Sequence, residues 1–238
     1  MPKNSPDRAG GGLHPDGRPS AIRIPAGLVV LVGPPASGKT SFVRALVERR
    51  QIEAEAVVSS DEIRAELFGA PGRPEPTDSG AADAADGVNA ADAVDAAGGV
   101  NAADAADARI FEERDRRIVA RLAAGRSVIA ESTNVTPQAR ARLVALARRF
   151  DAPVTALRFA PEVADLLQQY AERGRTDLTT ADVRAYAAVM SRDAGADRLR
   201  SEGAAAVHDV PGRRQSVTPA EAAARFVFGR VLPGYHLT

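Results

Sequence analysis

One eight-residue segment combines the residue types that hold phosphate groups. Residues 33–40 read GPPASGKT and fit the pattern G-x-x-x-x-G-K-[ST] at every fixed position. Glycines let the backbone curl until successive N–H groups point inward, and a helix that begins there adds the positive end of its dipole. The pattern therefore predicts an ATP-binding loop made of Gly33, Pro34, Pro35, Ala36, Ser37, Gly38, Lys39, Thr40 and Ser41.

Two side chains of this loop have distinct predicted tasks. Lys39 is a mobile positive charge that would reach the β- and γ-phosphates of ATP. The hydroxyl of Thr40 would complete the oxygen shell of a Mg²⁺ ion that bridges the same phosphates. The loop leaves open whether the γ-phosphoryl group goes to water, to a small alcohol or to a nucleic acid.

A second candidate pair, Asp61 and Arg64, lies in the segment SSDEIR at residues 59–64. This segment follows an expected strand, and ligands of open parallel sheets bind at the carboxyl ends of the strands. There Asp61 could accept the proton of an attacking hydroxyl, and Arg64, three residues later on the same helical face, could clamp a phosphate. The alternative is a carboxylate stabilised by the helix dipole beside a solvated arginine.

Alternating strands and helices must position these residues. An aliphatic run predicts a strand at residues 28–32, and the alternating pattern predicts further strands at 56–58, 127–130, 153–159 and 205–210. Helical spacing and capping signals predict helices at 41–50, 61–68 with Ser60 as N-cap, 110–122, 136–149, 162–173 and 179–191. This order predicts an α/β, three-layer P-loop NTPase fold, with a parallel sheet of about five strands and helices on both faces.

Two regions depart from that pattern. Residues 1–24 are rich in proline, glycine and polar residues and predict a disordered N-terminal arm, followed by one domain at 25–238 with a C-terminal helix at about 219–230. Residues 71–107 form a low-complexity insert in which GVNAADA occurs twice and eight acidic residues face the single basic residue Arg73. The insert is either a solvated loop expansion or a tethered polyanion that occupies a nucleic-acid groove.

Composition excludes several classes of site. The chain has no cysteine, which rules out disulfides, cysteine-ligated metal sites and thiol nucleophiles. Its three histidines are scattered, so we expect any metal to be held by oxygen atoms. The 31 basic and 31 acidic residues cancel, so a charged partner must bind at a local patch. Without a signal peptide or a long apolar run, we expect a cytoplasmic protein with no membrane partner.

Three segments together carry a family resemblance. GPPASGKT, SSDEIR and ARLAAGRSVIAESTNVTPQARARLVALARRF make residues 27–175 similar to the P-loop kinases that include bacterial and phage polynucleotide 5′-hydroxyl kinases and small AAA-type ATP-binding proteins. The resemblance implies that Asp61 is the general base and that Arg64 contacts a phosphate of the acceptor. It also implies a lid whose arginines, here Arg173 and Arg175, stabilise charge in the transition state.

The chain departs from this family at two places. Many relatives have D-x-T-N after the third core strand, where this chain has ESTN, so Glu131 would help to orient Mg²⁺-bound water with a longer side chain. The segment QQYAERGRT lacks the arginine and asparagine pair that is common in the lids of relatives, and Arg173 has the alternative role of a helix C-terminal cation.

Several other residues favour a structural interpretation. Phe68, Phe111 and Tyr170 are single aromatic residues for which packing is the simpler role, and Arg213 and Arg214 fit a solvated turn better than a contact with adenine or phosphate.

The functional prediction is an ATP-dependent kinase, with ATP and Mg²⁺ as cofactors, that phosphorylates a hydroxyl acceptor such as a nucleic-acid 5′ end. The alternatives are a small-molecule kinase of the same fold and a nucleotide-dependent switch, or AAA-type ATP-binding protein, that phosphorylates no acceptor.

Overall fold

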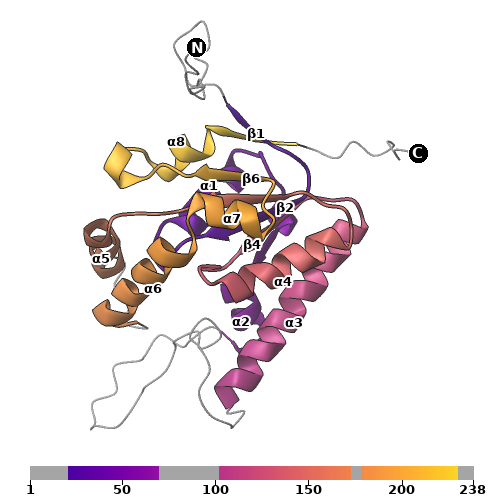
Figure 1. Cartoon of the computed structure of the whole chain (residues 1–238), viewed down its shortest axis with the longest axis horizontal. Coiled ribbons are helices and arrows are strands. Elements are labelled where there is room, and N and C mark those ends of the chain that lie inside the picture. The colour runs from indigo at the N-terminus through magenta and orange to yellow at the C-terminus, as the bar shows by residue number, and fades with distance from the viewer. Residues whose placement is uncertain (1–20, 70–101, 173–177, 230–238) are drawn as a thin grey trace, which may run out of the picture.

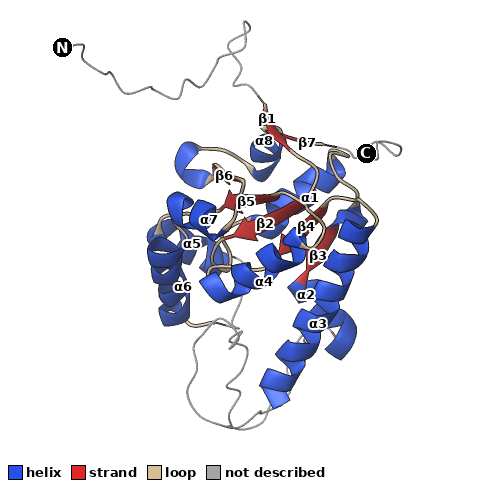
Figure 2. Ribbon diagram, turned by 45° about the vertical axis from the view of Figure 1, so that its right-hand side comes forward, coloured by secondary structure: helices blue, strands red, loops and turns tan. Residues whose placement is uncertain are grey.

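A five-stranded parallel sheet forms the centre of the molecule (Figure 2). The computed structural model describes residues 21–69, 102–172 and 178–229. The strands are β2 (Leu28–Val32), β3 (Val57–Ser59), β4 (Val128–Glu131), β5 (Val154–Arg158) and β6 (Ala206–Asp209), in the spatial order β3-β4-β2-β5-β6. The predicted α/β fold is confirmed, and each of the five predicted strands agrees within one residue at either end.

The aliphatic run of β2 reflects burial of both faces of the sheet. Leu28, Val30 and Val32 pack into one hydrophobic cluster, whereas Val29 and Leu31 pack into another. Successive side chains of a strand point to opposite faces, so a strand covered on both sides has no polar position to alternate with. β2 is accordingly buried at all five residues.

Helices cover the two faces of this sheet (Figure 1). On one face lie α1 (Lys39–Glu48) and the short α8 (Pro219–Ala223), which contribute Phe42, Leu46 and Ala223 to the core. The other face is covered by α2 (Ser60–Phe68), α3 (Ala102–Ala123), α4 (Pro137–Arg148) and α7 (Ala196–Glu202). α5 (Val163–Glu172) and α6 (Thr180–Asp193) pack against each other, with Leu166, Tyr170 and Val183 between them.

The two ends of the described chain form a small second sheet that sequence analysis missed. β1 (Ile22–Ile24) pairs in parallel with β7 (Phe226–Phe228). Two predictions are therefore wrong in part: residues 22–24 of the predicted arm form a strand, and the predicted helix at 219–230 ends at Ala223 and is followed by a strand. Burial explains both corrections, because Ile24 and Phe226 join the apolar cluster beneath α1. The rest of the arm, residues 1–20, lies outside the described residues.

Three further boundaries differ from the predictions. α3 begins at Ala102, so residues 102–107 of the predicted insert are helical, which agrees with the high helix propensity of alanine. The remainder of the insert within 71–101 lies outside the described residues. Ser59 caps α2 in place of Ser60 and accepts a hydrogen bond from the backbone N–H of Glu62, and α7 was not predicted. In the described ranges, no helix is long and apolar enough to cross a membrane.

We expect Phe42→Ala to be strongly destabilising. Phe42 is 1% exposed and meets Phe159 and Phe226 edge to face, with ring centroids 5.4 and 5.6 Å apart. Removal of such a buried ring should lower the free energy of unfolding by about 3–5 kcal/mol, measurable by urea denaturation. Val163→Ala is the control, because Val163 is 38% exposed and its truncation should change stability by no more than about 0.5 kcal/mol. Equal effects of the two changes would contradict this account of the core.

Candidate active site

The phosphate-binding segment is a tight turn between β2 and α1. The backbone N–H of Gly33 donates to the carbonyl of Thr133 at 2.9 Å, which fixes the turn against the segment after β4. A Cβ atom on Gly33 would lie 2.7 Å from the carbonyl oxygen of Phe159, so only glycine fits there. Gly38 has a φ of 98°, a left-handed conformation that favours glycine, and it stands directly before α1. The turn therefore presents the N-terminus of α1 at the edge of the sheet.

Lys39 lies inside this turn. Its side chain is 8% exposed, and its ammonium group donates hydrogen bonds of 2.8 Å to the carbonyl oxygens of Gly33 and Pro34. A longer contact of 3.4 Å joins it to the hydroxyl of Ser37. The positive charge is thus held at the place where the loop motif requires a phosphate-binding cation.

Thr40 and Glu131 form the second part of the site. The hydroxyl of Thr40 donates to Oε1 of Glu131 at 2.6 Å, which joins the start of α1 to the end of β4. The pKa of Glu131 is raised, chiefly because the carboxyl group is buried. The hydrogen bond from Thr40 and the charge of Lys39 act in the opposite direction, and the charges of Asp61 and Glu62 add to the rise. The pair offers two oxygen ligands at the edge of the phosphate loop, which fits a Mg²⁺ ion that takes its other ligands from phosphates and water.

Asp61 lies at the same edge of the sheet. It occupies the first turn of α2, directly after β3, and Ser59 at the end of β3 is in register with Glu131. Asp61 is exposed, and its charge contributes to the raised pKa of Glu131. An accessible carboxylate therefore lies close enough to Glu131, at the edge of the phosphate loop, to raise its pKa.

Arg64 has a carboxylate partner that the sequence did not reveal. Its Nη2 lies 2.6 Å from Oδ1 of Asp107, a residue of α3 and the last acidic residue of the predicted insert. The side chain of Arg64 remains 41% exposed, whereas that of Asp107 is 10% exposed. Asp107, which belongs to the described part of the insert, thus forms an ion pair with Arg64, the residue predicted to clamp a phosphate. Arg173 and Arg175, the predicted lid arginines, lie outside the described residues.

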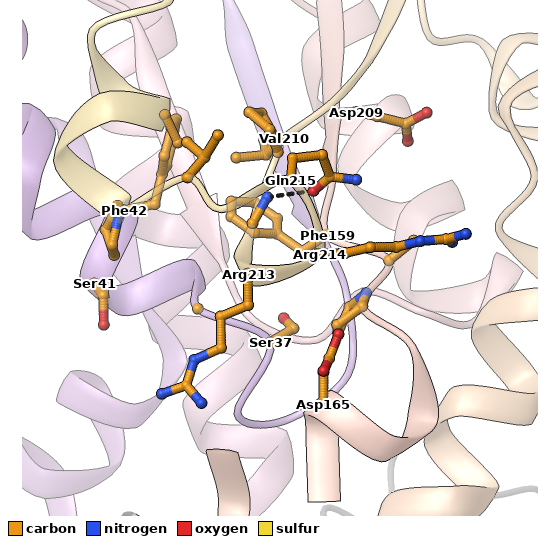
Figure 3. Close-up of a pocket in the computed structure, with 18 of the residues that line it drawn as sticks. Ser37, Ser41, Phe42, Phe159, Asp165, Asp209, Val210, Arg213, Arg214 and Gln215 are labelled. Carbon is orange, nitrogen blue, oxygen red and sulfur yellow. Dashed lines mark hydrogen bonds between the residues drawn. The ribbon is translucent and has the colours of Figure 1, made fainter. Parts of the chain in front are cut away.

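A cavity of about 510 Å³ opens beside the phosphate loop (Figure 3). Ser37, Ser41 and Phe42 line it from the loop and α1, and the turn after β6 also contributes to its wall. That turn contains Arg213 and Arg214, which we interpreted from sequence as solvated. In the structure both side chains are exposed, at 50% and 69%, as interpreted; they also line the cavity and form ion pairs, Arg213 with Glu172 and Arg214 with Glu162. Their place beside the cavity follows from their position directly after the last strand of the sheet.

Two buried residues that sequence analysis did not single out shape the loop after β4. Asn134 adopts a φ of 48° and its amide donates to the carbonyl of Leu31 at 2.8 Å. Arg140 is 3% exposed, and its guanidinium donates to the backbone carbonyls of Asn134 and Val135 and to the carboxylate of Glu202. Both residues position the segment that begins with Glu131.

Comparison with known proteins adds a family assignment. A family model named AAA_33, described as an AAA domain, matches residues 28–192. No curated protein matches the chain.

Several solved structures align with this chain at low identity. A chain of the Pnkp1/Rnl/Hen1 RNA repair complex aligns with 17% identity and a TM-score of 0.50, over 74% of this chain and 46% of that one. This protein therefore spans less than half of that chain's length. A putative kinase from Chloroflexus aurantiacus J-10-fl aligns with 16% identity and a TM-score of 0.46, over 84% and 92% of the two chains. Shikimate kinase from Acinetobacter baumannii in complex with shikimate aligns with 15% identity and a TM-score of 0.47, over 84% and 90%.

We expect Gly33→Ala to weaken ATP binding at least tenfold. The added methyl group would approach the carbonyl oxygen of Phe159 to 2.7 Å and must displace the turn that holds Lys39. Gly195→Ala is a matched control, because a Cβ atom there meets nothing within 4 Å. Isothermal titration with ATP should separate the two variants, and equal ATP affinities would show that the close approach at Gly33 does not shape the site.

Glu131→Gln should stabilise the ligand-free protein at neutral pH. Since burial raises the pKa of Glu131 above 4.5 in the folded state, folding opposes ionisation of this carboxyl group. Its contribution to stability therefore falls as pH rises from 4.5 through the raised pKa. The amide avoids that cost, so the difference in Tm between variant and parent should grow between about pH 4 and about pH 8. A difference that is constant with pH would contradict the assigned cause.

Proposed function

The chain belongs to the AAA_33 family of AAA domains, and from this we propose that it is an ATP-dependent kinase that phosphorylates a hydroxyl acceptor, with polynucleotide 5′ ends as the leading candidates. The observation that carries the proposal is the convergence of three side chains at one edge of the sheet. Lys39 and Thr40 come from the start of α1, and Asp61 comes from the start of α2. A phosphate clamp and an accessible carboxylate are the minimum that phosphoryl transfer to an alcohol requires.

The phosphate loop would hold the triphosphate of ATP. Lys39 would exchange its contacts with the loop carbonyls for contacts with phosphate oxygens, and the N-terminus of α1 would add its dipole. Thr40 and Glu131 would hold Mg²⁺, which neutralises charge on the phosphates when bound. The cavity beside Ser37 and Ser41 would receive the nucleoside, with Arg213 and Arg214 in its wall.

Asp61 would act as the general base. As the acceptor oxygen attacks the γ-phosphorus, its proton would pass to the Asp61 carboxylate, and the bond between the γ-phosphorus and the bridging oxygen would break to release ADP. Arg64 would contact a phosphate of the acceptor, and Arg173 and Arg175 would stabilise the phosphoryl group in flight. The family resemblance supports these three arginine assignments.

One observation favours a second candidate. Arg64 already pairs with Asp107, so much of its charge is compensated before any acceptor arrives. An uncharged small alcohol would not need that charge, which makes a small-molecule kinase of the same fold the alternative. A panel of acceptors with labelled ATP would separate the two, because only the leading candidate requires a nucleic-acid acceptor.

We expect Asp61→Asn to bind ATP normally and to lose phosphoryl transfer by about a hundredfold or more, as for the loss of a general base. The assay uses radiolabelled ATP with 5′-hydroxyl DNA, 5′-hydroxyl RNA and small alcohols. Glu62→Gln is the matched control, because Glu62 is an exposed carboxylate in the same turn of α2. Transfer at the parental rate by Asp61→Asn would eliminate the assigned base, and transfer to none of the acceptors would eliminate the kinase.

A further inference from the structure

We propose that the far end of α2 is a second acceptor subsite, at which Phe68 and Arg109 bind a nucleotide that lies downstream of the 5′ end in a single strand. The proposal rests on the proposed function and extends it, because it predicts that the acceptor is an oligonucleotide and neither a mononucleotide nor a small alcohol.

The geometry of α2 places three side chains on one face of the helix. Asp61, Arg64 and Phe68 are spaced by three and four residues, which is the spacing of neighbours along an α-helix. With a rise of about 1.5 Å per residue, Asp61 and Phe68 are separated by about 10.5 Å along the axis. In a stacked strand with a rise of about 3.4 Å per nucleotide, this distance corresponds to about three nucleotides.

Phe68 is exposed and is accompanied by a cation. It is 45% exposed, and the guanidinium carbon of Arg109, on α3, lies 5.2 Å from its ring centroid. Arg109 is itself exposed. Two other arginines lie over phenylalanine rings, but Arg114 is buried and Phe150 packs against the core, so those pairs are structural. Within the described ranges, Phe68 and Arg109 form the only arginine–phenylalanine contact in which both side chains are exposed.

The charge of Arg109 distinguishes it from its neighbours on α3. Arg114 pairs with Asp115, Arg116 pairs with Glu113, and Arg117 pairs with Glu113 and Glu66. Among the described residues, no carboxylate forms an ion pair with Arg109. A positive charge that is not compensated by a carboxylate and that lies over an accessible aromatic ring is complementary to a nucleotide, which has a π-face and an anionic backbone.

α3 also contacts two of the side chains on this face of α2, Arg64 and Phe68. Asp107 binds Arg64 at 2.6 Å, and Arg109, two residues later, contacts Phe68. The bond to Asp107 fixes the orientation of the Arg64 guanidinium group, and the side chain is 41% exposed, so a backbone phosphate can approach it. A single strand that lies along α2 would therefore meet three side chains in order. Asp61 would accept the proton of the 5′-hydroxyl, Arg64 would contact a backbone phosphate, and Phe68 would stack on a base.

The test is a length series of 5′-hydroxyl oligothymidylates, bound to the full chain in the presence of a non-hydrolysable ATP analogue. Parental affinity should rise about tenfold when the strand becomes long enough to reach Phe68, because stacking on an aromatic residue commonly contributes that much per base. Phe68→Ala and Phe68→Leu should both lose the rise, since leucine keeps an apolar side chain but has no π-face. Leu67→Ala is the control, because Leu67 is 36% exposed and precedes Phe68 in the same turn but has no aromatic ring to stack on a base.

Arg109→Gln provides an independent readout. Loss of one phosphate contact should reduce the slope of log affinity against log salt by about 0.7 for a single strand. The affinity for ATP and the Tm should stay at parental values in all four variants, because each changed residue is exposed.

The outcomes separate this proposal from the proposed function. Length-dependent binding that requires Phe68, without any phosphoryl transfer, would support the subsite and exclude the proposed kinase activity. Transfer that requires Asp61, with affinity independent of strand length or unchanged in Phe68→Ala and Phe68→Leu, would support the kinase and overturn the subsite.

Discussion

The parallel arrangement of β2, β3 and β4 is the constraint on which the candidate site depends. Because the three strands run in one direction, their carboxyl ends meet at one edge, and the residues that follow them are brought together. Lys39 and Thr40 follow β2, Asp61 follows β3, and Glu131 ends β4. The hydrogen bond of 2.6 Å between Thr40 and Glu131 joins two of these strand ends directly. This arrangement by itself brings Lys39, Thr40, Asp61 and Glu131 to one edge of the sheet.

Much of the fold could be predicted because its signals are local. β2 is an uninterrupted aliphatic run, and the phosphate loop is a contiguous motif whose meaning does not depend on tertiary contacts. The pair β1 and β7 could not be predicted in this way, because each strand has three residues and the two are about two hundred residues apart. A capping box at Thr218 correctly located the start of α8, but nothing in the sequence marked its end after five residues.

The same difference between local signals and long-range contacts applies to the candidate site. Lys39, Thr40 and Asp61 were predicted from motif and strand order, whereas the partner of Arg64 was not, because Asp107 lies 43 residues away across the low-complexity insert. Phe68 was interpreted as a core or surface packing residue; it is 45% exposed, and its contact with Arg109 of α3 was not predicted. Arg213 and Arg214 were interpreted as a solvated turn and both are exposed, but their place beside the cavity depends on tertiary structure that the sequence pattern does not show. Side chains that meet across long loops are specified by packing, and packing is not visible in a linear pattern.

The pairing of β1 with β7 has a mechanical consequence. The strands are parallel, and hydrogen bonds of 2.7 Å from Ile22 to Arg225 and of 2.8 Å from Gly229 to Ile24 close the pair. Tension applied between residues 21 and 229 would pull parallel neighbours in opposite directions along their own axes. Such a load shears all the bonds at once, whereas an antiparallel hairpin pulled from its open end would unzip them one at a time. This terminal clasp would consequently resist stretching before the central sheet carries any force.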